Sequence, residues 1–170
     1  MVEPVPFLFE RLRVNYSGIQ KQIQFANVAV TTCSGKKSFY YIDQSAKNSI
    51  PDLPEWYDQL GSFERNHISK HFDRLPDEFI VETAIITVSL ADLFTRYSIE
   101  RIDLLHIDTE GHDWSILQQL DLHKYHPSII LFEWKHISQD ERQEAIAALG
   151  KFYTMTLLDV TGDMLCIIRQ

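Results

Sequence analysis

The residues best placed to do chemistry lie in the segment IDLLHIDTEGHDW, residues 102–114. Asp108 and Glu110 follow a short apolar run, and Gly111 allows the backbone to turn sharply into the next element. In an open parallel sheet, ligands bind beyond the carboxyl ends of the strands. A further acidic residue, Glu133, ends the next apolar run in LFEW. Two neighbouring strands are therefore expected to bring carboxylates to one end of the sheet, which favours a functional site there.

Two other interpretations of this acidic segment stay open. Asp108 and Glu110 could simply cap the following helix, whose N-terminal dipole favours negative charge. His106, Asp108, Glu110 and His112 alternate, so a strand through all four would point them to one side, as in some metal sites. Because Gly111 breaks the strand, we expect it to end at Asp108 and His106 to face into the sheet as a hydrogen-bonded histidine. We predict no metal site, and a metal-assisted enzyme using these carboxylates and a histidine stays an alternative.

The composition is that of a globular protein, with 170 residues of which 45% are hydrophobic and 24% charged. A net charge of -8 and a pI near 5.3 argue against nucleic acid and membrane partners, because those need clustered Lys and Arg. No apolar run reaches the roughly 18 residues of a membrane span, and the N-terminus does not have a signal-peptide pattern. We therefore predict a cytoplasmic protein. Cys33 and Cys166 stand outside any CxxC spacing and predict neither a disulfide nor a zinc site.

The N-terminal part is expected to form a helix followed by two strands. Pro6 suits the first position of a helix, and turn residues at 15–18 predict its end. Residues 23–30 and 37–43 are rich in β-branched and aromatic residues, which predicts a strand for each segment.

A long segment, residues 45–82, separates these strands from the next one, predicted at 84–88. It is polar and contains three prolines, and loops of this length usually carry function, so it is interpreted as an insertion or lid. Within it, GSFERNHISKHF could form a short helix that places His67 near His71.

The second half alternates strands and helices, which is typical of βαβ units and a parallel sheet. Capping boxes are predicted at Ser89 with Asp92 and at Ser138 with Glu141. The predicted elements are a helix at 90–97, a strand at 101–107, a helix at 114–122, a strand at 128–132, a helix from 138 to Gly150, and an antiparallel hairpin at 152–159 and 163–169.

The segment IDLLHIDTEGHDWSILQQLDLHKYHPSIILFEWKHIS resembles the signature of the FkbM family of S-adenosylmethionine-dependent methyltransferases. In that family one strand ends in an Ile-Asp-x-Glu-Gly turn and the next ends in Glu. The opening VEPVPFLFERLRVNY resembles the family's second strand and following helix, and NVAV resembles its third strand. The similarity follows the family's order over nearly the whole chain.

The resemblance implies an α/β fold with a Rossmann-like class I methyltransferase sheet, mostly parallel with a terminal antiparallel hairpin. It implies one domain over residues 1–170, with the insertion or lid at 45–82. The family's first strand and glycine-rich turn should precede Glu3, so we expect the chain to be truncated at its N-terminus, with the central first strand missing. Self-association or a partner chain could then complete the sheet.

The resemblance also implies S-adenosylmethionine as the cofactor. The acidic residue that ends the second strand, here Glu3, would bind the ribose hydroxyls, because a carboxylate can accept from both. The end of the third strand would flank the adenine, which points to Asn27, Val28 and Ala29. The turn after the fourth strand would face the transferred methyl group, which places Asp108 at the cofactor.

The function implied is methyl transfer to a hydroxyl of a sugar or secondary metabolite, so that the partner is a small-molecule or glycan substrate. Asp108 and Glu110 are the predicted catalytic residues, as candidates for the base that takes up the hydroxyl proton. His67, His71 and Glu133 are predicted to contact the substrate. The alternative is a non-catalytic, truncated remnant or interaction domain of the same fold.

Overall fold

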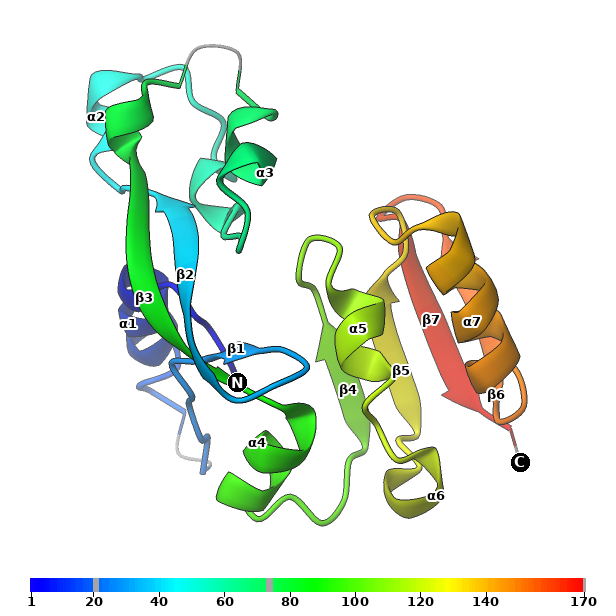
Figure 1. Cartoon of the computed structure of the whole chain (residues 1–170). Helices are drawn as coiled ribbons and strands as arrows, with labels where there is room; N and C mark the ends of the chain where they lie inside the picture. The colour runs from blue at the N-terminus through cyan, green and yellow to red at the C-terminus, as the bar shows by residue number, and fades with distance from the viewer. Residues whose placement is uncertain (20–21, 73–74, 170) are drawn as a thin grey trace. The chain divides into compact units, whose positions relative to one another are not determined.

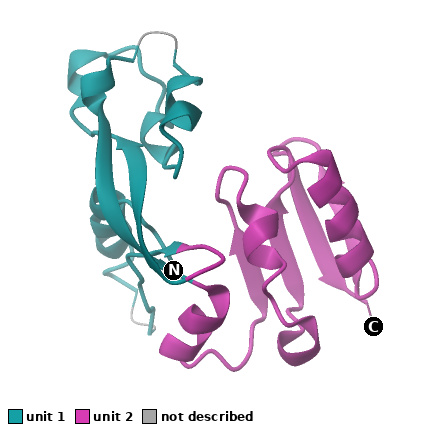
Figure 2. Ribbon diagram, viewed as in Figure 1, with its two compact units in different colours: residues 1–29, 34–88 teal, residues 30–33, 89–170 magenta. Residues whose placement is uncertain are grey.

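The computed structural model describes residues 1–19, 22–72 and 75–169, and it divides into two compact units (Figure 2). Unit 1 comprises residues 1–29 and 34–88, and unit 2 comprises residues 30–33 and 89–170. Both contain helices and strands, in agreement with the predicted α/β class. None of the helices described is long and apolar enough to span a bilayer.

Unit 1 is built on a long antiparallel strand pair (Figure 1). β2 (Gly35–Ile42) pairs with β3 (Ile80–Val88), and the three-stranded sheet has the order β1-β3-β2, with β1 at Ala29–Val30. Helix α1 (Pro6–Asn15) begins at the proline and ends where predicted. β3 begins four residues before the strand predicted at 84, so the end of the 45–82 segment belongs to the sheet.

The predicted strand at residues 23–30 is wrong for most of its length. Only the last two residues form β1, and Ala26 makes an isolated parallel bridge with Val2. Ala26 N–H donates to the Met1 carbonyl, and the Ala26 carbonyl accepts from Glu3 N–H. β-branched content shows that a segment fits a pleated surface, but the length of a strand is set by the partner that pairs with it.

The 45–82 segment is packed around its own apolar cluster. It contains α2 (Ala46–Ser49), the 3₁₀ turns η1 (Tyr57–Gln59) and η2 (Asp77–Phe79), and α3 (Arg65–Ser69), which is the short helix predicted there. The rings of His67 and His71 are 5.0 Å apart between centroids, as the helical spacing predicted. The cluster consists of Ile42, Ala46, Leu53, Tyr57, Leu60, Ile68 and Ile80. Its interpretation as an insertion or lid stays a prediction.

Unit 2 contains a four-stranded sheet of order β4-β5-β7-β6 (Figure 1). Within this sheet β4 and β5 are parallel, whereas β5–β7 and β6–β7 are antiparallel. The terminal hairpin is confirmed, whereas the described sheets are mixed and not mostly parallel. The reason is that the short β6–β7 turn forces those strands antiparallel and β7 then inserts beside β5. The strands are β4 (Leu104–Ile107), β5 (Ile129–Glu133), β6 (Tyr153–Leu158) and β7 (Asp163–Ile168).

Capping residues set the helix limits in unit 2. The Ser89 side chain accepts from Asp92 N–H at the start of α4, and Ser138 forms the predicted capping box with Glu141 at the start of α7. The helix predicted at 114–122 is broken in two, because the Asp121 side chain accepts from the N–H groups of the next turn and starts a new helix. The helices are α4 (Leu90–Arg96), α5 (Asp113–Leu117), α6 (Leu122–Tyr125) and α7 (Gln139–Leu149).

The core of unit 2 lies between its sheet and the helices α5 and α7 (Figure 1). Ile130 and Phe132 of β5 are fully buried there, with Trp114 and Leu117 of α5. The alternation of a strand puts the intervening residues on the opposite face. Three of them lie side by side in register and are exposed: Leu104, Ile129 and Ile167.

Candidate functional site

The parallel pair β4 and β5 brings the predicted acidic residues to one end of the unit 2 sheet. Ile107 is opposite Phe132, so that Asp108 and Glu133, the next residue on each strand, leave the sheet at the same end. Glu133 is 4% exposed, whereas Asp108 is accessible to solvent. The prediction that two neighbouring strands deliver carboxylates to one end is confirmed.

The turn after β4 is tight and places Glu110 over the segment that follows β5. Glu110 and Gly111 both adopt positive φ values, 52° and 102°. A Cβ added to Gly111 would lie 3.4 Å from the His136 carbonyl oxygen and 3.7 Å from the His136 Cβ. The glycine is therefore required both for the backbone turn and for this close approach.

Asp113 ties this turn to β5. It is fully buried at the start of α5, and its Oδ1 accepts from the Glu133 N–H at 3.1 Å. Its Oδ2 accepts from the Thr109 hydroxyl at 2.9 Å and from the Thr109 N–H at 3.3 Å. Burial raises the pKa of this carboxyl, and the hydrogen bonds that it accepts oppose the shift. Asp113 thus fixes the separation between the turn and Glu133.

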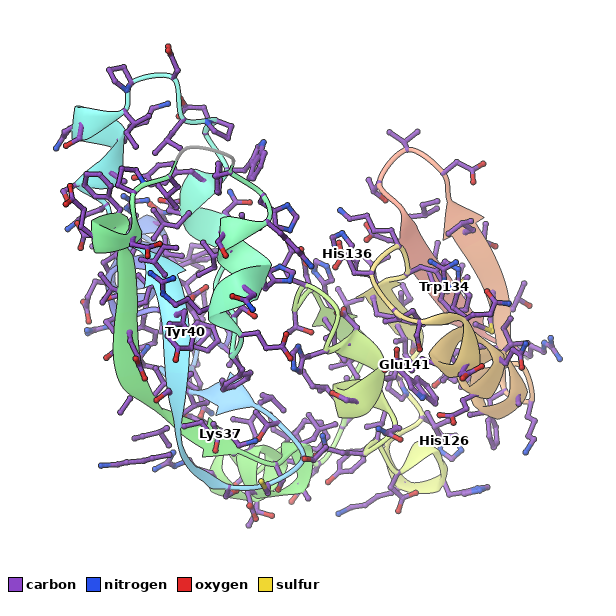
Figure 3. The ribbon with its side chains drawn as sticks, turned by 45° about the horizontal axis from the view of Figure 1, so that its top comes forward. Lys37, Tyr40, His126, Trp134, His136 and Glu141 are labelled. Atoms are coloured by element: carbon purple, nitrogen blue, oxygen red, sulfur yellow. The ribbon has the colours of Figure 1, made fainter. Side chains whose placement is uncertain are left out.

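The Glu133 carboxylate is held from both sides. The Lys135 Nζ lies 2.9 Å from Oε1, and the His136 Nδ1 lies 2.8 Å from Oε2. The same Nδ1 lies 3.1 Å from Glu110 Oε2. The His136 side chain is 33% exposed and stands in the segment between β5 and α7 (Figure 3).

The carboxyls at this end of the sheet are crowded, and their pKa values change accordingly. Desolvation raises the pKa of Asp108 and of Glu110, and the neighbouring negative charge of Glu133 raises both further. The hydrogen bond to Glu133 raises the pKa of Lys135. These carboxyls therefore hold protons more readily than free side chains do, which suits groups that accept and release a proton.

The spacing of Glu110, Glu133 and His136 would also allow a metal ion, since one ligand atom from each lies within 4.8 Å of the others. In the structure the His136 Nδ1 lies between the two carboxylates, at hydrogen-bond distance from both. The three side chains therefore form a hydrogen-bonded carboxylate–histidine cluster, and the metal-assisted alternative stays untested.

The predicted site residues fall into both units. Unit 2 brings together Asp108, Glu110 and Glu133, whereas unit 1 contains Glu3, Asn27, Val28 and Ala29, together with His67 and His71 on and after α3. The prediction that His106 faces into the sheet is wrong: it is exposed on β4, because the alternation that buries Ile107 turns His106 to the other face.

Within unit 1, Glu3 and Asn27 lie side by side. The Asn27 Nδ2 donates to the Glu3 carbonyl at 2.9 Å and to the Pro4 carbonyl at 3.1 Å. The Glu3 Oε1 accepts from the Val5 N–H at 2.7 Å, which fixes the carboxyl at the start of α1. Burial raises the pKa of Glu3. Val28 and Ala29 are buried, and Asn27 is exposed.

Sequence reasoning did not identify Asp113 and Lys135 as residues of the unit 2 site, and for His136 it favoured an ordinary exposed residue over a residue that lines the site. The spacing Glu133-x-x-His136 is a signal that could have identified the histidine, because the first turn after a strand often folds residues three apart toward each other. Asp113 gave no such signal, since an Asp at the start of a helix is ordinarily explained by the helix dipole.

Unit 2 has an α/β fold, and its acidic site lies at the carboxyl end of a parallel strand pair. Open α/β sheets bind ligands at this end of their strands. Residues 1–160 match the sequence model of the family described as the methyltransferase FkbM domain, and the chain belongs to this family. Comparison with curated proteins and with solved structures gives no match. The resemblance inferred from the acidic turn and from VEP is thereby confirmed.

Proposed function

We propose that this chain transfers the methyl group of S-adenosylmethionine to a hydroxyl oxygen of a sugar or secondary metabolite. The observation that carries the proposal is the family match over residues 1–160, which includes the carboxylate-rich turn after β4. S-adenosylmethionine would supply a methyl group on a positively charged sulfur, and clustered carboxylates suit a positively charged donor.

The residues of unit 1 fit the ribose and adenine of such a cofactor. Glu3 is held by the Val5 N–H through one oxygen, and a carboxylate has acceptor capacity left for two hydroxyl groups. Asn27 is exposed and fixed by its two bonds, so it is the residue available to the adenine edge. Val28 and Ala29 are buried and would contribute through the backbone.

The residues of unit 2 would receive the acceptor. The accessible Asp108 and the half-buried Glu110, the predicted candidates for the base, would accept a hydrogen bond from the hydroxyl group and orient its oxygen toward the methyl carbon. Most of the rate in such a displacement comes from holding donor and acceptor in line. Glu133, His67 and His71 stay predicted substrate contacts.

Two further expectations belong to this proposal. β4 is an edge strand of the described four-stranded sheet, so its outer backbone groups are available to the additional strand implied by the family or to a partner chain.

The 45–82 segment would act as a lid whose hydrogen exchange slows when cofactor and acceptor are bound.

The test combines binding and turnover on the 170-residue chain. Calorimetric titration with S-adenosylmethionine measures binding, and transfer of a radiolabelled methyl group to a panel of methyl glycosides measures activity. The proposal requires both cofactor binding and methyl transfer. A folded chain that neither binds the cofactor nor methylates any acceptor would favour the non-catalytic alternative.

A substitution at Glu3 checks the cofactor assignment. Glu3→Gln removes a charge-assisted bond to the ribose, and we expect the dissociation constant for S-adenosylmethionine to rise about 10- to 100-fold. Glu10→Gln on the exposed side of α1 is the matched control and should change it little. Equal affinities of Glu3→Gln and the wild-type chain would contradict the assignment.

A further inference from the structure

The two carboxylates around His136 determine which of its ring nitrogens carries a proton. An ionised carboxylate can only accept hydrogen bonds, so the nitrogen between Glu133 Oε2 and Glu110 Oε2 must be the donor. That nitrogen is Nδ1. In the neutral imidazole the lone pair therefore lies on Nε2, on the opposite side of the ring from the carboxylates.

The ring is also held in orientation. Glu133 is buried, its Oε1 is paired with Lys135, and its backbone N–H donates to the buried Asp113. Gly111 packs against the backbone of His136, which fixes the position of the backbone from which the ring extends. A carboxylate that holds Nδ1–H while Nε2 faces outward is the arrangement in which histidine acts as a base.

We propose that His136 is the general base of the methyl transfer and that Glu133 is the residue that positions it. This inference rests on the proposed function and assigns the proton acceptor within that site. Asp108 and Glu110 then orient the acceptor hydroxyl, and the hydroxyl proton passes to the Nε2 of His136.

The step is a single displacement. His136 Nε2 takes the proton of the acceptor hydroxyl while the hydroxyl oxygen forms a bond to the methyl carbon. The carbon–sulfur bond breaks, and its electron pair stays on the sulfur, which becomes neutral. The imidazolium afterwards returns its proton to solvent through the exposed part of the side chain.

Two carboxylates contact the His136 ring, Glu110 from the turn after β4 and Glu133 from the end of β5. The positively charged side chains of the neighbouring sequence are Lys135 on the same segment, which is paired with Glu133, and Arg142 on α7. Arg142 is tied to the backbone of that segment by bonds to the Trp134 and Lys135 carbonyls.

Turnover of the His136→Gln variant tests the assignment. With the methyl glycoside that the wild-type chain methylates fastest, we expect kcat to fall about 100- to 10,000-fold. The acceptor KM and the dissociation constant of S-adenosylmethionine should stay within about threefold, because the group acts on the proton and not on binding. His123→Gln, an exposed histidine of α6, is the matched control. A His136→Gln variant with wild-type kcat would overturn the proposal.

The role of Glu133 is tested by Glu133→Gln and Glu133→Asp. A positioning role predicts a lower kcat for the amide and recovery toward wild type in the aspartate variant, at unchanged cofactor affinity. A loss of cofactor affinity equal to the loss of kcat in both variants would show that Glu133 is merely structural.

A measurement that needs no acceptor tests the orientation of the ring. Nitrogen-15 NMR of the histidine-labelled chain, with His136 assigned by its absence in His136→Gln and recorded where the ring is neutral, should show the proton on Nδ1. A neutral ring protonated at Nε2, or selective broadening of His136 by micromolar Mn²⁺, would overturn the proposal.

These outcomes separate the two proposals. A wild-type chain that neither binds S-adenosylmethionine nor transfers its methyl group overturns the proposed function. A wild-type chain that does both, while His136→Gln is equally active, overturns the assignment of the base alone.

Discussion

Gly111 is the residue on which the shape of the acidic turn depends most directly. Its φ of 102° is strained for any L side chain, and an added Cβ would also press on His136. We expect Gly111→Ala to lower the free energy of unfolding by about 1–3 kcal/mol in urea titrations. Gly18→Ala, at a glycine with no atom within 4 Å of an added Cβ, should change it by less than about 0.5 kcal/mol. Equal changes in unfolding free energy for the two variants would contradict the conclusion that the turn requires a glycine at position 111.

Glu110 gives a prediction about pH. Its pKa is raised above the ordinary 4.5 by desolvation and then by Glu133, so the folded state binds this proton more tightly than the unfolded state. The stabilisation of the folded state by the protonated Glu110 carboxyl is greatest below pH 4.5, and it is lost as the pH rises through the higher pKa of the folded state. Glu110→Gln, which cannot ionise, should therefore be slightly more stable than wild type at pH 8.

The measurement is the urea midpoint of both proteins at pH 8 and pH 4. The advantage of Glu110→Gln should shrink at pH 4, where the wild-type carboxyl is protonated. Glu100→Gln, at an exposed position, should show no such pH-dependent difference. A Glu110→Gln variant that is less stable than wild type at pH 8 would show that the contact between the Glu110 carboxylate and His136 Nδ1 outweighs the crowding.

At the scale of elements, the start of α7 is set by its capping box. Ser138 accepts from the Glu141 N–H, and the Glu141 carboxylate accepts from the Ser138 N–H. Ser138→Ala leaves the Glu141 N–H without its side-chain acceptor, and we expect it to cost about 1 kcal/mol of unfolding free energy. Ser49→Ala, at the exposed end of α2, is the control and should cost less. Because His136 precedes this cap by two residues, the loss of the capping box should also make hydrogen exchange faster at residues 135–139.

Elements with local signals were predictable from the sequence. Pro6 placed the start of α1, the capping residues placed α4 and α7, and Gly162, with a φ of 80°, placed the final hairpin turn. The strand at 23–30 was not predictable, because pairing is decided by the partner, and here that partner is the chain's own first residues.

At the scale of the whole molecule, the chain has apolar clusters that share no residue and belong to different units. Ile68→Ala opens a cavity in the cluster of the 45–82 segment, and Ile130→Ala opens one under the unit 2 sheet; both side chains are fully buried. Each should destabilise its own unit by about 2–5 kcal/mol. Hydrogen exchange followed by mass spectrometry should show faster exchange mainly in the unit that carries the substitution, and each variant is the control for the other. Equal acceleration in both units for both variants would contradict separate cores.

The sequence by itself determined the acidic turn, the carboxylate at the end of the next strand and the family to which the chain belongs, because these depend on residue order along continuous segments. The α/β class followed for the same reason. Only the tertiary structure decided that β7 lies antiparallel beside β5, that Asp113 is buried as the tie between turn and strand, and that His136 stands between two carboxylates. These features arise where segments distant in sequence meet, and the free energy of such contacts depends on burial and geometry that no local pattern of residues contains.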